Sequence, residues 1–147
     1  MKLLVLAVGR LPKDWVFAGC AEYEQRLRVH MPVCVQELKS EEQLKSRLPP
    51  RYPLWALDES GEAWSSIEFA QQLHRARCQA HPGLALLIGG PDGHSSGLRS
   101  KADRLVSLSK LTLPHRLARL VLLEQLYRAA SILGNSPYHR EGQVTKK

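Results

Sequence analysis

The sequence predicts a single α/β domain built on a mostly parallel sheet with helices on both faces. Short apolar runs of strand length alternate with amphipathic stretches of helical period along nearly the whole chain. That alternation is typical of parallel sheets whose crossover segments are helices. The 147 residues fit one domain, and 44% hydrophobic with 24% charged residues is ordinary for a globular protein.

The first third contains two strands and two helices. Residues 3–8 are continuously apolar, which predicts a strand covered on both faces. Asp14 can cap a helix with a stripe of apolar residues at helical spacing, namely Val16, Cys20, Tyr23 and Leu27. Residues 33–37 alternate as a half-buried strand does. Ser40 to Gln43 forms a capping box for a short helix that ends before Pro49.

The middle of the chain continues the alternation. Residues 54–57 predict a short strand that closes on Asp58 and a turn over residues 59–61. Ser65 and Glu68 form a second capping box, and the stripe of that helix consists of Phe69, Leu73 and Ala76. Residues 84–88 predict a fully buried strand.

A glycine-rich turn, Gly89 to Gly93, follows that buried strand and precedes a predicted helix that includes residues 98–104. In open α/β sheets, ligands bind at the carboxyl ends of strands, where glycine lets them approach the backbone. The turn lacks both the dinucleotide and the P-loop glycine patterns. By themselves these residues leave two interpretations open, a ligand site or a tight turn without a ligand. Residues 107–114 alternate apolar and polar side chains, which by itself suggests a strand.

The last predicted helix, residues 116–133, is apolar on almost every side. Such a helix needs cover on more than one side. Either a partner subunit or the rest of the same subunit can provide that cover. The apolar residues are Leu117, Leu120, Val121, Leu122, Leu123, Leu126, Tyr127, Ala130 and Ile132.

The charge and the end of the chain point towards nucleic acid. A formal net charge of +7 favours a polyanionic partner. Tyr138, His139 and Arg140 follow a turn-prone Asn-Ser-Pro segment. Tyrosine can stack on a base, arginine can bind a phosphate, and histidine can exchange a proton near neutral pH. A solvated tail is the alternative interpretation.

Several classes of site have no support in the sequence. The three cysteines are odd in number and form no Cys-x-x-Cys pair, which indicates reduced thiols in a cytoplasmic protein. The six histidines show no metal-ligand spacing, so we predict no metal. No apolar run approaches the length of a membrane span.

Four blocks together resemble one family. The blocks are Leu86–Gly93, Ser107–His115, Glu124–Ala129 and Asn135–Glu141, and Leu57–Glu62 matches as well. They resemble the bacterial large-subunit ribosomal RNA pseudouridine N3-methyltransferases, which are small SPOUT methyltransferases. The resemblance covers residues 1–141 as one methyltransferase domain. Residues 142–147 extend beyond it, and we expect them to be a disordered tail.

The resemblance implies a C-terminal trefoil knot, a homodimer, and S-adenosylmethionine bound in the knot. It implies methylation of a pseudouridine in ribosomal RNA within assembled ribosomes. By matching motifs, the cofactor pocket would comprise Leu57, Asp58, Gly89, Gly90, Ser109, Lys110, Leu111, Thr112, Leu113 and Pro114. That assignment replaces the structural interpretation of residues 107–114. Tyr138, His139 and Arg140 would serve the RNA target as the catalytic group, across the dimer interface.

The mechanistic hypothesis follows from the chemistry of pseudouridine N3, which carries an imide proton and attacks a methyl group only once that proton leaves. His139 is the preferred proton acceptor and Arg140 its electrostatic partner. Water is the alternative acceptor, which would leave His139 a positioning role. Two rival functions are a SPOUT methyltransferase for another RNA position, such as a ribose 2′-hydroxyl, and a ribosome-associated RNA-binding protein without catalysis.

Overall fold

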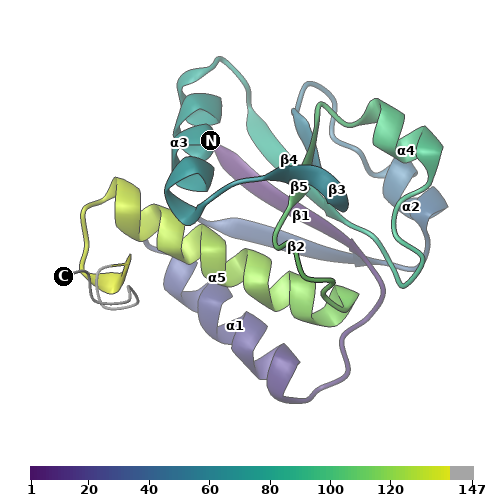
Figure 1. Ribbon diagram of the computed structural model, residues 1–147, viewed down its shortest axis with the longest axis horizontal. Coiled ribbons are helices and arrows are strands. Elements are labelled where there is room, and N and C mark those ends of the chain that lie inside the picture. Colours follow the sequence, from purple (N-terminus) through teal and green to yellow (C-terminus); the bar gives the residue numbers. More distant parts are fainter. Residues whose placement is uncertain (140–147) are drawn as a thin grey trace.

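The computed structural model describes residues 1–139 and shows one sheet of five parallel strands between two layers of helices (Figure 1). The strand order is β2-β1-β4-β3-β5, and each pair of neighbours is parallel. The strands are β1 (Lys2–Val8), β2 (Val33–Leu38), β3 (Leu54–Ala63), β4 (Gly83–Ile88) and β5 (Arg104–Ser107). The α/β class and the helices on both faces are therefore confirmed.

Alternation along the strands divides the core into two layers. From β1, Leu3 and Val5 face the layer that contains the three longer helices, whereas Leu6 faces the layer that contains the two short ones (Figure 1). The longer helices are α1 (Trp15–Leu27), α3 (Ser66–Cys78) and α5 (His115–Leu133). The short helices are α2 (Glu41–Ser46) and α4 (Ser96–Lys101). Strand β4, in the middle of the sheet, is buried along its whole length, as predicted.

The predicted helix starts are confirmed by their caps. The Asp14 side chain accepts hydrogen bonds from the backbone N–H groups of Val16 and Phe17. The capping box of Ser65 and Glu68 has both of its hydrogen bonds. The box at Ser40 is half formed, because the Gln43 side chain accepts from the backbone of Lys39 instead.

Helix α5 packs between α1 and α3 on one face of the sheet (Figure 1). Leu122, Leu123 and Leu126 are fully buried there. Within one subunit, neighbouring helices thus provide much of the cover that this apolar helix requires. Leu117, Leu120 and Val121 nonetheless remain partly exposed.

The turn predicted over residues 59–61 is wrong, because β3 continues to Ala63. Both Leu57 and Glu62 pair with Val106 of β5, so residues 58–61 bulge out of the ladder between them. Gly61 permits this close approach, since a Cβ there would lie 2.4 Å from the carbonyl carbon of Leu105. The pairing with a distant strand decides this segment, and the local sequence does not show it.

The helix predicted to reach Arg104 ends instead at Lys101. Asp103 binds Leu54 in both directions: its N–H donates to the Leu54 carbonyl at 2.8 Å, and its carboxylate accepts from the Leu54 N–H at 2.7 Å. These bonds draw the chain into β5 beside β3. The strand suggested by the alternation over 107–114 is also wrong, because β5 ends at Ser107 and a loop follows.

None of the helices within residues 1–139 is long and apolar enough to cross a membrane. The three cysteines are free thiols, of which only Cys20 is buried. The trefoil knot stays a prediction.

We predict that Gly61→Ala destabilises the fold by about 1–3 kcal/mol, because the new methyl group would overlap the backbone of β5. The free energy of unfolding in urea measures this effect. Gly97→Ala is the matched control, since a Cβ in α4 would meet its nearest neighbour at 3.7 Å, an ordinary contact. The control should leave the stability unchanged or raise it slightly. Equal stabilities for the two variants would contradict the bulge geometry.

Candidate functional site

A cleft of about 750 Å³ opens at the carboxyl ends of β3, β4 and β5. Its size is within the range of small-molecule sites, and its position is where open α/β sheets bind ligands. Its walls come from segments that are far apart in the sequence. They are the bulge of β3, the glycine turn after β4, the loop 107–114 after β5, and the first turn of α5.

The structure brings the predicted cofactor residues together. All of them except Lys110 line the cleft, namely Leu57, Asp58, Gly89, Gly90, Ser109, Leu111, Thr112, Leu113 and Pro114. Lys110 is exposed and lies outside the lining. The assignment also missed several lining residues, among them Ser60, Asp92, Arg99 and His115. Nothing local marks Ser60 or Arg99, because the bulge and the placement of α4 bring them to the cleft.

The glycine turn gives the cleft a wall of bare backbone. The N–H of Gly93 donates to the Gly90 carbonyl at 2.9 Å, and Gly93 has a φ of +72°, a conformation that favours glycine. A Cβ at Gly89 would lie 2.8 Å from the carbonyl carbon of Gly93. Side chains at Gly89 and Gly93 would disrupt the turn. Because these residues have no side chains, a ligand in the cleft can contact the backbone of the turn directly.

Asp58 places a carboxylate in the cleft. Its side chain accepts hydrogen bonds from the Ser60 hydroxyl and, at 3.0 Å, from the Ser60 backbone N–H, and Arg99 lies 3.7 Å away. Burial alone would raise the pKa of Asp58. The hydrogen bonds from Ser60 and the charge of Arg99 outweigh burial, so the pKa lies below the usual value of 3.8. The carboxylate is therefore ionised at neutral pH.

The loop after β5 forms the opposite wall. The Ser107 hydroxyl donates to the Ser109 carbonyl at 2.8 Å, and the Ser109 hydroxyl accepts from the Leu111 N–H at 2.9 Å. These bonds hold the loop in an irregular conformation. The Leu111 side chain is 75% exposed at the cleft, which leaves an apolar group available to cover a ligand.

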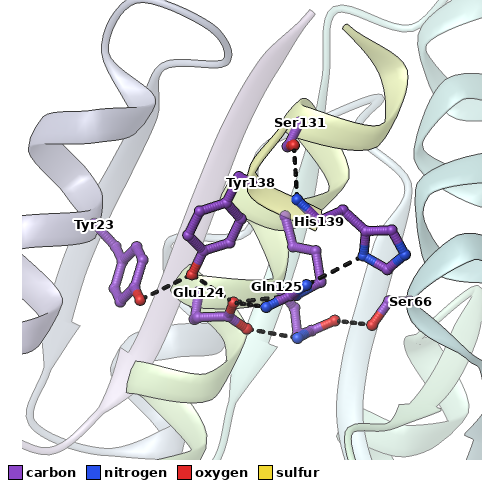
Figure 2. Close-up of polar contacts among 8 residues, drawn as sticks. Tyr23, Ser66, Glu124, Gln125, Ser131, Tyr138 and His139 are labelled. Atoms are coloured by element: carbon purple, nitrogen blue, oxygen red, sulfur yellow. Dashed lines mark hydrogen bonds and ion pairs between the residues drawn. The ribbon is translucent and has the colours of Figure 1, made fainter. Parts of the chain in front are cut away.

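Tyr138 and His139 lie together near the far end of α5, where Figure 2 shows a network of polar contacts. The Tyr138 hydroxyl donates to Glu124 at 2.9 Å and lies 3.0 Å from the Tyr23 hydroxyl. Since Tyr138 gives its only proton to Glu124, Tyr23 is the donor in the second bond. Burial, followed by these contacts, raises the pKa of Tyr138, so its hydroxyl remains protonated.

His139 is held on both its backbone and its ring. Its backbone N–H donates to the Ser131 hydroxyl at 3.2 Å, and its Nδ1 lies 3.1 Å from the Arg128 guanidinium (Figure 2). Arg140, the third residue of the predicted catalytic group, lies outside the described residues.

The cleft and this tail contact different parts of α5. The cleft is lined by His115 and Ala118 at the start of the helix. The tail contacts Glu124, Arg128 and Ser131 farther along it. From Ala118 to Arg128, the contact of His139, the helix rises about 15 Å at 1.5 Å per residue. In one subunit, then, the predicted cofactor residues and the predicted catalytic residues form two separate groups. Within residues 1–139, moreover, no three histidine, cysteine, aspartate or glutamate side chains are grouped as a metal site would require.

An all-parallel α/β domain with a ligand cleft at the carboxyl ends of its strands is an architecture that enzymes share with many binding proteins. Comparison with known proteins narrows the class. The family model described as "Predicted SPOUT methyltransferase" matches residues 1–139. The chain therefore belongs to the SPOUT methyltransferase family. It is an RNA methyltransferase, and S-adenosylmethionine is the methyl donor of this class.

Curated relatives match from end to end. A protein of Dechloromonas aromatica named "Ribosomal RNA large subunit methyltransferase H" is 45% identical over 97% of this chain and 100% of its own length. A protein of Geobacter sulfurreducens with the same name is 41% identical over 95% of this chain and 99% of its own.

Solved structures show the same fold at low sequence identity. A probable methylase family protein of Haemophilus influenzae has a TM-score of 0.58 at 8% identity, covering 99% of this chain and 71% of its own. A structure reported for 2-OH methylation of C/U34 on tRNA has a TM-score of 0.51 at 15% identity, covering 88% of this chain and 91% of its own.

We predict that Ser60→Ala raises the pKa of Asp58, because the carboxylate loses the hydroxyl hydrogen bond that favours its charged form. Carboxyl carbon chemical shifts measured against pH give this pKa directly. A carboxyl whose pKa is lowered by folding stabilises the protein above its unfolded pKa, and this contribution disappears as the pH falls through the folded pKa. The stability difference between wild type and Ser60→Ala should therefore be larger at pH 7 than well below pH 3.8. A difference independent of pH would contradict this electrostatic role.

Proposed function

We propose that the protein is a cytoplasmic homodimer that methylates N3 of a pseudouridine in large-subunit ribosomal RNA, within assembled ribosomes. The observation that carries the proposal is end-to-end identity of 41–45% with proteins named as large-subunit ribosomal RNA methyltransferases. The resemblance of residues 124–129 and 135–141 to the pseudouridine N3-methyltransferases supplies the position on the base.

The cleft has the chemistry that S-adenosylmethionine requires. Leu57 and Leu113 offer apolar surface for the adenine ring, and Gly89 and Gly90 present backbone without side chains at the cleft. The ionised carboxylate of Asp58 suits a cofactor that carries hydroxyl groups and cationic centres. When bound, the cofactor supplies an electrophilic methyl group on a sulfonium sulfur. We infer that the lining residues hold it and exclude water from that group.

The RNA base has to reach this cleft together with the polar tail. In one subunit His139 contacts Arg128, which lies about 15 Å along α5 from Ala118 in the cleft lining. In a dimer the tail of one subunit can complete the cleft of the other. The partly exposed Leu117, Leu120 and Val121 on α5 offer apolar surface for such an interface. Pairing two chains of +7 also doubles the positive charge that attracts RNA.

Methyl transfer to ribosomes tests the proposal. Ribosomes that lack this modification are incubated with the protein and labelled S-adenosylmethionine, and the digested RNA is examined by nucleoside mass spectrometry. N3-methylpseudouridine in the large-subunit RNA is the expected product. A 2′-O-methylated nucleoside would instead support the ribose-specific alternative. Absence of label from all RNA would exclude the proposed reaction.

We predict that His139→Ala lowers the rate of methyl transfer by about 10²–10⁴-fold, the range for a residue that assists proton transfer or charge stabilisation. Cofactor affinity, measured by calorimetry, should stay at the wild-type value, because His139 is not among the residues that line the cleft and is proposed to act on the RNA base. A wild-type rate of transfer would remove His139 from the mechanism.

A further inference from the structure

We propose that Glu124 and Arg128 are positioning residues that dock the tail on α5 and fix His139 as a hydrogen-bond donor through Nε2, so that it is not the proton acceptor. The inference deepens the proposed function, because His139 belongs to the same composite site. It rests on the contacts drawn in Figure 2.

Glu124 is the centre of the network. Its carboxylate accepts from the Tyr138 hydroxyl at 2.9 Å and from Arg128, whose guanidinium nitrogens lie 3.1 and 3.2 Å away. The Gln125 side chain donates to the same carboxylate at 2.5 Å and in turn accepts from Ser66 on α3 at 2.6 Å. One carboxylate on α5 thus connects the tail to a neighbouring helix (Figure 2). It compensates the charge of Arg128 where both side chains are about four-fifths buried.

The rings around the network fix the tail further. The Tyr138 ring packs edge-on against Tyr127, with centroids 4.7 Å apart. The Arg128 guanidinium lies over the Tyr138 ring, 4.9 Å from its centroid. Through Tyr23, the Tyr138 hydroxyl also reaches α1. These contacts leave the backbone of the tail little freedom, so the His139 ring has a defined position beside Arg128.

Arg128 determines which nitrogen of His139 carries the proton. A guanidinium has only donors, so the 3.1 Å contact between Arg128 Nη1 and His139 Nδ1 requires Nδ1 to accept. An imidazole that accepts at Nδ1 carries its proton on Nε2. Because Nδ1 already accepts a hydrogen bond and Nε2 is protonated, neither nitrogen can take a proton from the base in this arrangement. The ring can instead donate from Nε2.

A hydrogen-bond donor beside the base would assist this reaction. Loss of the imide proton from pseudouridine N3 leaves negative charge that is shared with the two flanking carbonyl oxygens. An Nε2–H directed at one of these oxygens stabilises that charge as it develops, as oxyanion-hole donors do. The imide proton then passes to water, and N3 uses its electron pair to form the bond to the methyl carbon. The bond from that carbon to the sulfonium sulfur would break at the same time, and its electron pair would stay on the sulfur as a neutral thioether. Glu124 and Arg128 take part only by holding the donor.

The tautomer can be measured without RNA or activity. Two-dimensional NMR of protein labelled with ¹⁵N-histidine distinguishes protonated from unprotonated ring nitrogens. The wild-type dimer near pH 7.5 should show His139 with Nε2 protonated and Nδ1 unprotonated. Arg128→Leu should remove that preference, whereas Arg128→Lys, which keeps a cationic donor, should preserve it at least in part. A wild-type ring with its proton on Nδ1, or on both nitrogens, would overturn the proposal.

Substitution of His139 provides the second test. The glutamine side chain offers an N–H donor but takes up no proton near neutral pH, so His139→Gln should transfer methyl groups at least about tenfold faster than His139→Ala. The comparison uses single-turnover transfer to ribosomes. Suppose that His139→Gln is no faster than His139→Ala, and that the wild-type rate falls as the pH drops through an ionisation that neither variant shows. His139 is then the proton acceptor, and the proposal is wrong.

The two tests separate this inference from the proposed function. If wild-type protein methylates no ribosomal RNA, the proposed reaction fails, whereas the NMR spectrum still decides the tautomer and the role of Arg128. If the reaction occurs but the tautomer is the opposite one, only the positioning role fails.

Discussion

The fixed position of α5 is the constraint on which the rest of the structure depends. Its apolar side chains pack against the sheet between α1 and α3. A buried arginine of the same helix adds polar contacts to other parts of the chain. Arg119 is 4% exposed and donates to the Glu37 carboxylate at 2.5 Å and to the Gly9 carbonyl at 3.0 Å. Burial alone would raise the pKa of Glu37, but the hydrogen bonds from the Leu11 N–H and Arg119 outweigh burial and hold this pKa below its usual value, so the Glu37 carboxylate is ionised at neutral pH. A shift of α5 would leave a buried guanidinium without its counter-charge.

Because α5 is held in this way, its two ends define two different chemical environments. Its first turn joins a cleft with a glycine wall, an exposed leucine and an ionised aspartate, which suits a small ligand with cationic and apolar parts. Its second half holds a network of tyrosine, glutamate, arginine and histidine, which suits hydrogen bonds to a base. One rigid helix therefore separates the part of the site that is expected to bind the methyl donor from the part expected to meet the RNA.

The sequence predicted those features that local patterns determine. The cap at Asp14, the capping box at Ser65 and the buried β4 depend on neighbours within a few residues, and all three are confirmed. The errors occur where a distant partner decides the conformation. Val106 forces the bulge at residues 58–61, and Leu54 draws Asp103 out of the predicted helix.

The same distinction applies to the site. Motif resemblance, not periodicity, selected the residues that line the cleft, and of the cofactor residues it selected only Lys110 lies outside the lining. The role of Lys110 stays a prediction. Arg99 was missed because a tertiary contact brings it to Asp58, and Ser60 because its position depends on the bulge that the pairing with β5 creates. The sequence also suggested His139 as a base, yet it could not reveal that Arg128, one helical turn before the end of α5, would contact its Nδ1.

The central claim is that the cleft of one subunit works with the tail of the other, and purified heterodimers test it most directly. One subunit carries Gly89→Val, which disrupts the cleft, and the other carries His139→Ala. In the proposed dimer one intact composite site remains, so methyl transfer to ribosomes should proceed at about half the wild-type rate. With both substitutions in one subunit and a wild-type partner, the account predicts almost no transfer. Half activity in this second heterodimer, with none in the first, would show that each subunit uses its own tail and would contradict the account.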